Sequence, residues 1–232
     1  MNAKRTASLL ILAAVLANVA FTALGSIFNY PDVLDEPAGQ VLASFREHEG
    51  AVSAWFTVLA LSAALLAPIA IGVGRLSSAR AMRIAVPVGI AAATVQVIGL
   101  LRWPILVPGY AADAANGSAG ARDAFTTASD ILGTALGETL GYLLTATWTT
   151  LVVVALGRRY AGRWFAVLGA ASAGLVLAGV LSPLSLPVID TANFLGYVLW
   201  SVWLIAFAVV ILVHERRAAA APATPSRAAV TS

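Results

Sequence analysis

Residues 51–73 read AVSAWFTVLALSAALLAPIAIGV, an unbroken apolar stretch without a charged side chain. A helix needs about 20 mostly apolar residues to cross a hydrocarbon core of about 30 Å, so this stretch predicts a transmembrane helix. The sequence contains further stretches of the same kind, and none of them alternates polar and apolar positions as a transmembrane strand would. We predict an all-α, polytopic transmembrane helical bundle with six spans, at about 7–28, 51–73, 84–106, 128–156, 164–184 and 191–213.

The composition agrees with a membrane protein. Of the 232 residues, 60% are apolar and only 11% are charged, whereas an average soluble domain is roughly 45–50% apolar and about 25% charged. This shift excludes a disordered chain, a collagen-like fibre and a soluble nucleic-acid binder as descriptions of the whole sequence. The absence of cysteine excludes disulfide bonds, thiolate metal sites and a cysteine nucleophile.

The basic residues set the expected orientation of the bundle. When the N-terminus is placed in the cytoplasm, the segments on that side hold 11 of the 14 lysines and arginines, and Arg46, Arg102 and Arg122 remain outside. The positive-inside rule then predicts that both termini are cytoplasmic. We attribute the pI of about 9.7 to these basic clusters, which would face anionic lipid headgroups, and expect no nucleic-acid partner.

The source and the C-terminal segment also follow from composition. A chain with one lysine against 13 arginines and much alanine suggests a GC-rich bacterial genome, so we expect the plasma membrane of a bacterium. Residues 218–232 hold alanine, proline, serine and threonine with one arginine, and we predict a disordered cytoplasmic tail there.

Two segments on the predicted outer side are longer than simple turns. Asp35-Glu36-Pro37 is a helix-start signature, and residues 36–48 place their apolar side chains together. They predict an amphipathic helix along the outer membrane surface. Residues 107–125 are rich in glycine and predict a long loop, for which a functional lid and a merely flexible connection both stay open.

Charged side chains within spans are functional candidates by default. Counting about 1.5 Å per residue from the cytoplasmic anchors places Arg102 and Glu138 about 28 Å from the inner boundary. Asn193 falls within one turn of that level, with Tyr142 and Tyr197 just below. One interpretation is a polar site that opens outward, in which Arg102 presents its guanidinium to an anionic group or to Glu138. The other, which we favour, is an arginine–glutamate pair that joins the third and fourth spans, or an arginine that snorkels to headgroups.

A second polar layer lies deeper, at about 20 Å by the same count. Its members are Asn18, Gln96, Thr145 and Ser201. Interhelical hydrogen bonds are the commoner use of such residues in membranes, so we predict a structural role for this layer.

Gly133, Gly137 and Gly141 form a small-residue ridge on the fourth span. Residues at this spacing let two helices approach closely. We predict tight packing within the bundle, and a homodimer face is the alternative.

No motif supports catalysis or metal binding. Glu47-His48-Glu49 has no second histidine beside it, and consecutive helix residues point in different directions. His48 and His214 fall at opposite faces of the membrane, so they cannot ligate one haem. The sequence contains no phosphate-binding loop, dinucleotide fingerprint or nucleophile elbow. We therefore expect no catalytic residue, no metal and no cofactor.

Three runs of the sequence carry a family resemblance. They are residues 100–108 (LLRWPILVP), residues 137–145 (GETLGYLLT) with Trp148, and residues 196–204 (GYVLWSVWL). In these runs the chain resembles bacterial membrane proteins of the domain of unknown function 4386 family, over roughly residues 7–213. The resemblance implies a six-span bundle and implies that the motifs around Arg102 and Glu138 belong together. It implies no particular activity.

We predict a multi-pass integral membrane protein with a structural or regulatory role and without catalysis. The alternative is a transporter-like protein that binds a small solute or a lipid at an outward-facing polar site around Arg102 and Glu138. A third hypothesis is a lipid-modifying enzyme in which Glu138 acts as an acid or base. The expected partners are membrane lipids, together with a second copy of the chain or another membrane protein.

Overall fold

The computed structural model describes residues 2–184 and 186–220, and no strand occurs among them. In chain order the helices are α1 (Ala3–Phe28), η1 (Asp32–Asp35), α2 (Ala38–Glu47), α3 (Glu49–Ala64), α4 (Leu66–Val73), η2 (Gly74–Leu76), α5 (Arg80–Ile105), α6 (Val107–Ala115), α7 (Ala119–Ala128), η3 (Ser129–Leu140), α8 (Gly141–Ala161), α9 (Arg163–Ala178), η4 (Gly179–Leu184) and α10 (Pro187–Ala220). η1, η2 and η4 are 3-10 helices, whereas η3 is a π-helix.

Six continuous helical segments are long and apolar enough to cross a membrane. They are Ala3–Phe28, Glu49–Leu76, Arg80–Ala115, Ala119–Arg158, Arg163–Ser182 and Val188–Ala220. The all-helical bundle with six spans that the sequence predicts is therefore confirmed, and the chain is a multi-pass membrane protein by the length and composition of its helices.

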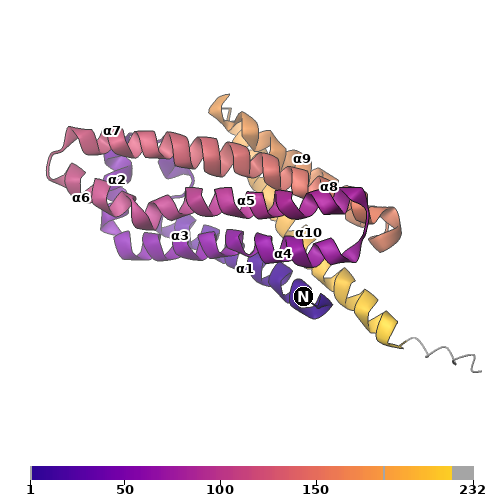
Figure 1. Cartoon of the computed structure of the whole chain (residues 1–232). Coiled ribbons are helices and arrows are strands. Elements are labelled where there is room, and N and C mark those ends of the chain that lie inside the picture. The colour runs from indigo at the N-terminus through magenta and orange to yellow at the C-terminus, as the bar shows by residue number, and fades with distance from the viewer. Residues whose placement is uncertain (1, 185, 221–232) are drawn as a thin grey trace, which may run out of the picture.

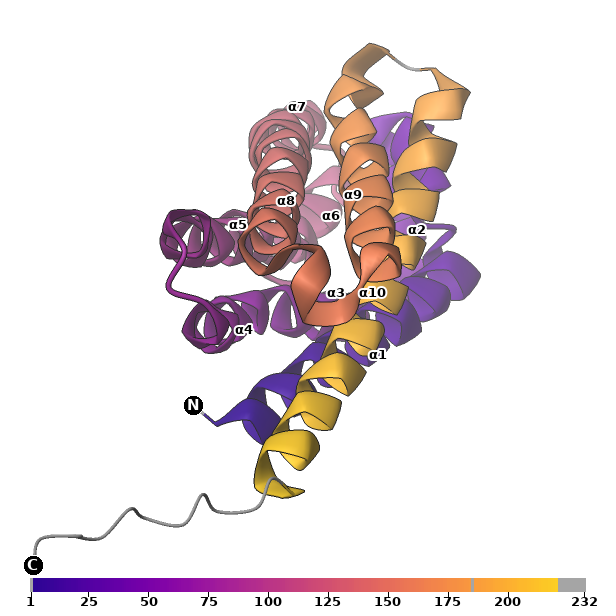
Figure 2. The ribbon, with the colours of Figure 1, turned by 90° about the vertical axis from the view of Figure 1, so that its right-hand side faces the viewer.

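The spans are arranged as a ring. Each span packs against the next one in sequence, and α1 packs against α10, which closes the ring. Figure 2 shows the bundle nearly end-on, with α5, α4, α1, α10, α9 and α8 arranged around the ring. Because the number of spans is even, the start of α1 and the end of α10 lie at the same end of the bundle (Figures 1 and 2).

Two apolar cores fill the ring, one in each half. The core nearer the termini contains Trp148 of α8 and Trp203 of α10, both fully buried. The other core surrounds Trp103 of α5 and contains Phe28 of α1 and Phe56 of α3. Among the described residues, no side chain of α9 or α10 belongs to this second core. α9 and α10 run obliquely to α3, α5 and α8 (Figure 1), so the far half of the ring is built chiefly by the first four spans.

The far end of the bundle is covered by α2, α6 and α7. The segment predicted as an amphipathic helix at 36–48 forms α2, which begins after Pro37 and not at Asp35, because Asp35 belongs to η1. α2 lies across the end of the bundle (Figure 1). Its apolar residue Phe45 packs edge-on against Phe28 and stacks on Trp103. The apolar face of α2 is therefore buried in the protein, not in lipid.

The segment predicted as a loop at 107–125 is helical instead. α6 and the start of α7 occupy it, and their turn contains Gly117, whose φ of 87° places it in the left-handed region. Ser118 caps α7 by accepting a hydrogen bond from the backbone N–H of Ala121 at 3.3 Å. The alanines between the glycines have a high helix propensity, and this outweighs the glycines that suggested a loop.

The fourth span has an irregular backbone in two places. Between α7 and α8 it forms the π-helix η3, in which backbone hydrogen bonds join residues five apart. At the end of the span and just beyond it, Gly157 and Gly162 have φ values of 62° and 87°, conformations that glycine adopts without strain, and the chain turns there into α9.

The last helix extends beyond the predicted span. α10 continues to Ala220, so the first residues of the segment predicted as a tail, 218–220, are helical. The rest of that segment lies outside the described residues.

Candidate functional site

Arg102 lies inside the ring, in the last turn of α5. Its side chain is only 6% exposed, and its guanidinium carbon lies 5.2 Å from the centroid of the Trp103 ring. Nη1 donates a hydrogen bond to the carbonyl oxygen of Gly99 at 2.7 Å. Nε is buried without a hydrogen-bond partner in the described part of the chain. A buried guanidinium with an unused donor is uncommon, because a buried polar group without a partner is energetically costly.

The glycines of α5 and η3 determine where Arg102 can lie. A Cβ atom on Gly133 would lie 2.7 Å from Nη2 of Arg102, so the guanidinium rests against the bare backbone of η3. A Cβ atom on Gly99 would lie 2.8 Å from the Cα of Gly137. The third glycine of the predicted ridge, Gly141, faces the side chain of Gln96. The ridge therefore lies against α5 within the bundle.

Glu138 interacts electrostatically with Arg102 from the π-helix. The same group of side chains includes Tyr142 of α8 and Tyr30, which follows α1. The pKa of Tyr30 is raised to about 12, chiefly by burial; the charge of Glu138 also raises this pKa, and the charge of Arg102 lowers it. The Tyr30 hydroxyl is consequently a hydrogen-bond donor at any ordinary pH. We call Tyr30, Arg102, Glu138 and Tyr142, with Tyr197 of α10, the outer polar cluster, because it lies in the half of the bundle away from the termini.

The sixth span contributes Tyr197 to this cluster. Its ring centroid lies 5.7 Å from that of Tyr142, at an interplanar angle of 62°. Its hydroxyl interacts electrostatically with Glu138 and lies near the side chain of Thr145. Tyr30, Glu138, Tyr142 and Tyr197 are half-buried, so part of each is reached from the surface of the protein.

Asn193 is placed differently from the other predicted site residues. Its Nδ2 donates a hydrogen bond to the backbone carbonyl oxygen of Val176 in α9 at 2.9 Å. Its amide and the Tyr142 ring both lie against Gly179, where an added Cβ would overlap them. Asn193 thus joins the fifth and sixth spans beside the outer polar cluster and supports Tyr142.

The deeper polar layer is a connected set of hydrogen bonds. Gln96 of α5 donates from Nε2 to Oγ1 of Thr145 in α8 at 2.8 Å. One turn further along α8, Thr149 accepts a hydrogen bond from Nε1 of Trp200 in α10, also at 2.8 Å. Thr149 itself donates to the backbone carbonyl oxygen of Thr145 at 2.9 Å. These bonds link three spans across the middle of the ring.

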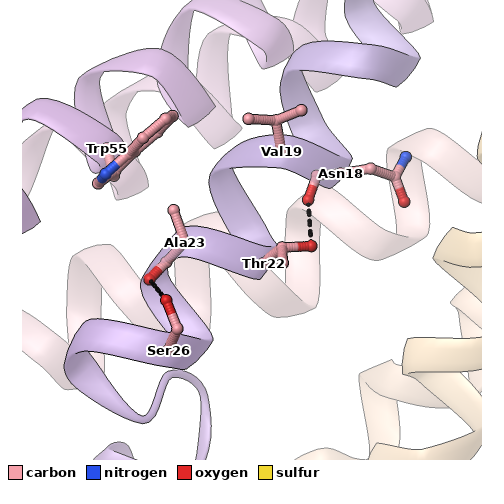
Figure 3. A pocket seen from close by; sticks show the side chains of 6 residues that line it. All are labelled: Asn18, Val19, Thr22, Ala23, Ser26 and Trp55. Carbon is pink, nitrogen blue, oxygen red and sulfur yellow. Dashed lines mark hydrogen bonds between the residues drawn. The ribbon is translucent and has the colours of Figure 1, made fainter.

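Asn18 lies outside this layer. Its side chain is exposed on α1, and its Nδ2 donates to the carbonyl oxygen of Ala14 in the same helix at 2.7 Å. Together with Thr22, Ser26 and Trp55 of α3 it lines a groove of about 410 Å³ on the exposed side of α1 (Figure 3). Thr22 and Ser26 also donate to backbone carbonyls of α1, so these side chains satisfy much of their hydrogen bonding within one helix.

The outer polar cluster offers donors and one fixed cation. Arg102 supplies charge and an unused N–H, and the tyrosine hydroxyls supply neutral donors around it. Such a set matches a carboxylate or phosphate, which accepts several hydrogen bonds at once. Glu138 is the acid of the set, and it gives the cluster a group that a cation or a neutral donor could contact.

Sequence analysis missed three residues that shape the cluster: Tyr30, Gly179 and Asp190. Tyr30 follows the first span, in a connection that a depth count along the spans does not reach. Asp190 is exposed and acts on Glu138 electrostatically. Gly179 gives no signal in sequence, because only the contact with Asn193 and Tyr142 shows why a side chain would not fit.

A comparison with protein families finds a match over most of the chain. A family model described as "Domain of unknown function (DUF4386)" matches residues 6–208. No curated protein and no solved structure matches the chain. The matched range contains every residue of the outer polar cluster and of the deeper layer. Since the family model covers most of the chain, this protein belongs to the DUF4386 family.

Proposed function

We propose that this protein is an integral membrane protein that binds a ligand. The outer polar cluster would hold a solute or a lipid headgroup that carries an anionic group. The observation that carries the proposal is the state of Arg102. Its guanidinium is buried, Nη1 is used by Gly99, and Nε has no partner among the described residues. A carboxylate or phosphate oxygen would satisfy that donor and balance the charge.

The surrounding side chains support the same ligand class. The pKa of Tyr30, raised to about 12, keeps its hydroxyl a donor, and donors suit an anion better than acceptors do. Glu138 interacts with Arg102 electrostatically, but Nε of Arg102 has no hydrogen-bond partner among the described residues. The cation is therefore less fully compensated than in a buried ion pair, where both charges are hydrogen-bonded.

A purely structural or regulatory role has its own support in the close packing of α5 on η3. Gly99 and Gly137 meet there backbone to backbone, as helices joined for stability do in membranes. That packing explains the glycines, but it does not explain a buried arginine with an unused donor. For this reason we place binding first, and we add no catalytic step.

Localisation forms part of the proposal. The arginine clusters favour a bacterial plasma membrane with both termini in the cytoplasm. The outer polar cluster would then open to the side opposite the termini, and its ligand would come from the outer leaflet or from the exterior.

The test is native mass spectrometry of the protein purified in mild detergent, comparing the wild type with Arg102→Gln. Glutamine keeps a polar side chain of similar reach but removes the charge. We expect a discrete bound adduct on the wild type and at least a tenfold lower occupancy on the variant, the loss of about one charge-assisted hydrogen bond.

Glu138→Gln is the matched control, because it removes the opposite charge from the same cluster. If the ligand is held as an anion, this variant keeps or gains the adduct, since one repulsive charge is gone. An adduct that survives in Arg102→Gln but disappears in Glu138→Gln would contradict the proposal and indicate a cationic ligand. Far-ultraviolet circular dichroism checks that both variants are folded.

A further inference from the structure

A second cavity, of about 290 Å³, opens at the end of the bundle that carries the termini. It lies where the end of α8, the start of α9 and the last turns of α10 meet. Its walls combine aromatic side chains, Tyr160 and Trp164, with the basic residues His214 and Arg217. Valines of α10, including Val213, form an apolar surface below them. This cavity lies at the opposite end of the bundle from the outer polar cluster and shares no residue with it.

The aromatic wall is held in place. Tyr160 stacks on His214 with a centroid separation of 4.6 Å and an interplanar angle of 22°. The ring of His214 is fixed through Nδ1, which lies 3.0 Å from the carbonyl oxygen of Val210. Trp164 is 51% exposed although it is large and mainly apolar. Tryptophan and tyrosine gather where hydrocarbon meets headgroups, so this wall marks that boundary.

The rim of the cavity is electropositive. Arg217 lines it, and α9 begins beside it at Arg163 and Trp164. The N-cap residue of α9 is Gly162, which has no side chain to satisfy the first N–H groups of the helix. The open N-terminus of a helix carries a partial positive charge and favours anions. Charge from a side chain and from a helix end therefore meets at one edge of an apolar groove.

We propose that this cavity is a binding site for one anionic phospholipid. The phosphate lies at Arg217 and the start of α9, the glycerol region lies beside Tyr160 and Trp164, and an acyl chain runs over Val213. An anionic phospholipid has both the charge and the apolar chain that this groove combines. On the predicted orientation, the lipid belongs to the cytoplasmic leaflet.

The experiment titrates phosphatidylglycerol or phosphatidylcholine into delipidated protein in mild detergent and follows the bound lipid by native mass spectrometry. We expect the wild type to bind the anionic lipid more tightly. Arg217→Ala should weaken that binding about fivefold, the effect of one basic residue near a membrane surface. Arg216→Ala is the matched control, because Arg216 neighbours Arg217 on α10 and does not line the cavity. Its binding should equal that of the wild type.

A second variant tests the cavity and not the charge. Val213→Trp places a large side chain over the apolar surface and should lower binding of the anionic lipid to the same degree while all arginines remain. Equal losses in Arg216→Ala and Arg217→Ala would overturn the proposal, because diffuse attraction then accounts for the binding. Equal affinities for the two lipids, or displacement of the lipid by inorganic phosphate, would overturn it as well.

Discussion

The two polar layers of the bundle differ in how their hydrogen bonds are used. In the deeper layer, Gln96, Thr145, Thr149 and Trp200 are joined to one another across three spans. In the outer layer, Arg102 is as deeply buried but leaves Nε without a partner among the described residues. Buried polar groups that are fully paired stabilise and fix an arrangement, whereas a buried group with an unused donor is suited to a ligand. Burial alone therefore does not distinguish a structural polar group from one that belongs to a binding site.

The largest expected effect comes from the helix contact that both layers share. Gly99 lies on α5 between Gln96 and Arg102, and an added Cβ would lie 2.8 Å from backbone atoms of η3. Gly99→Ala should force α5 and η3 apart and lower the free energy of unfolding by about 1–3 kcal/mol. It should also weaken ligand binding, because the side chains of α5 in both layers would shift relative to their partners on η3 and α8. Unfolding in a denaturing-detergent titration measures the effect.

Gly174→Ala is the control for that substitution. Gly174 lies within α9, and in the described part of the chain no atom outside its own helix backbone and chain neighbours lies within 4 Å of an added Cβ. Alanine there should be neutral or slightly stabilising, because alanine has the higher helix propensity. Equal destabilisation by both substitutions would show that the α5–η3 contact is not special.

A smaller effect is expected within the deeper layer. Gln96→Leu removes the hydrogen bond to Thr145 and should lower the free energy of unfolding by about 1 kcal/mol, the usual range for polar pairs between membrane helices. Ligand binding at Arg102 should remain unchanged. A double-mutant cycle with Thr145→Val isolates the pair, and a coupling energy near zero would contradict a structural role for this layer.

The sequence predicts much of this organisation, because a membrane imposes simple rules. Apolar length identifies the six spans, and the depth count along them places Arg102 and Glu138 at one level before any contact is known. The same count fails for Asn18, which shares the depth of Gln96 but faces outward. The depth of a residue follows from its number in the span. Whether its side chain points into the bundle or away from it depends on how obliquely the neighbouring helix crosses, and α10 runs obliquely to most of the bundle (Figure 1).

Other parts of the site are beyond a single sequence for local reasons. The π-helix η3 changes the hydrogen-bond register of the backbone, and nothing in the composition of residues 129–140 distinguishes it from an α-helix. Tyr30 was missed because it lies in a connection, which a count along spans does not reach. The covered end of the bundle was misjudged at 107–125, since glycine there marks turns between helices and not an irregular loop.

The smallest change in stability is expected where the outer layer loses both of its charges. In Arg102→Met with Glu138→Gln, the desolvated cation disappears together with the acid that interacts with it, so no uncompensated charge remains. Methionine fills a similar volume against Gly133. We expect the free energy of unfolding to change by less than about 1 kcal/mol, while the bound adduct is lost. If the double variant is destabilised more than Gln96→Leu in the same titration, the outer layer stabilises the fold as the deeper one does. The unpaired Nε of Arg102 then has no role in binding a ligand. If stability is kept and binding is lost, the charges are retained for the ligand, because the bundle does not need them.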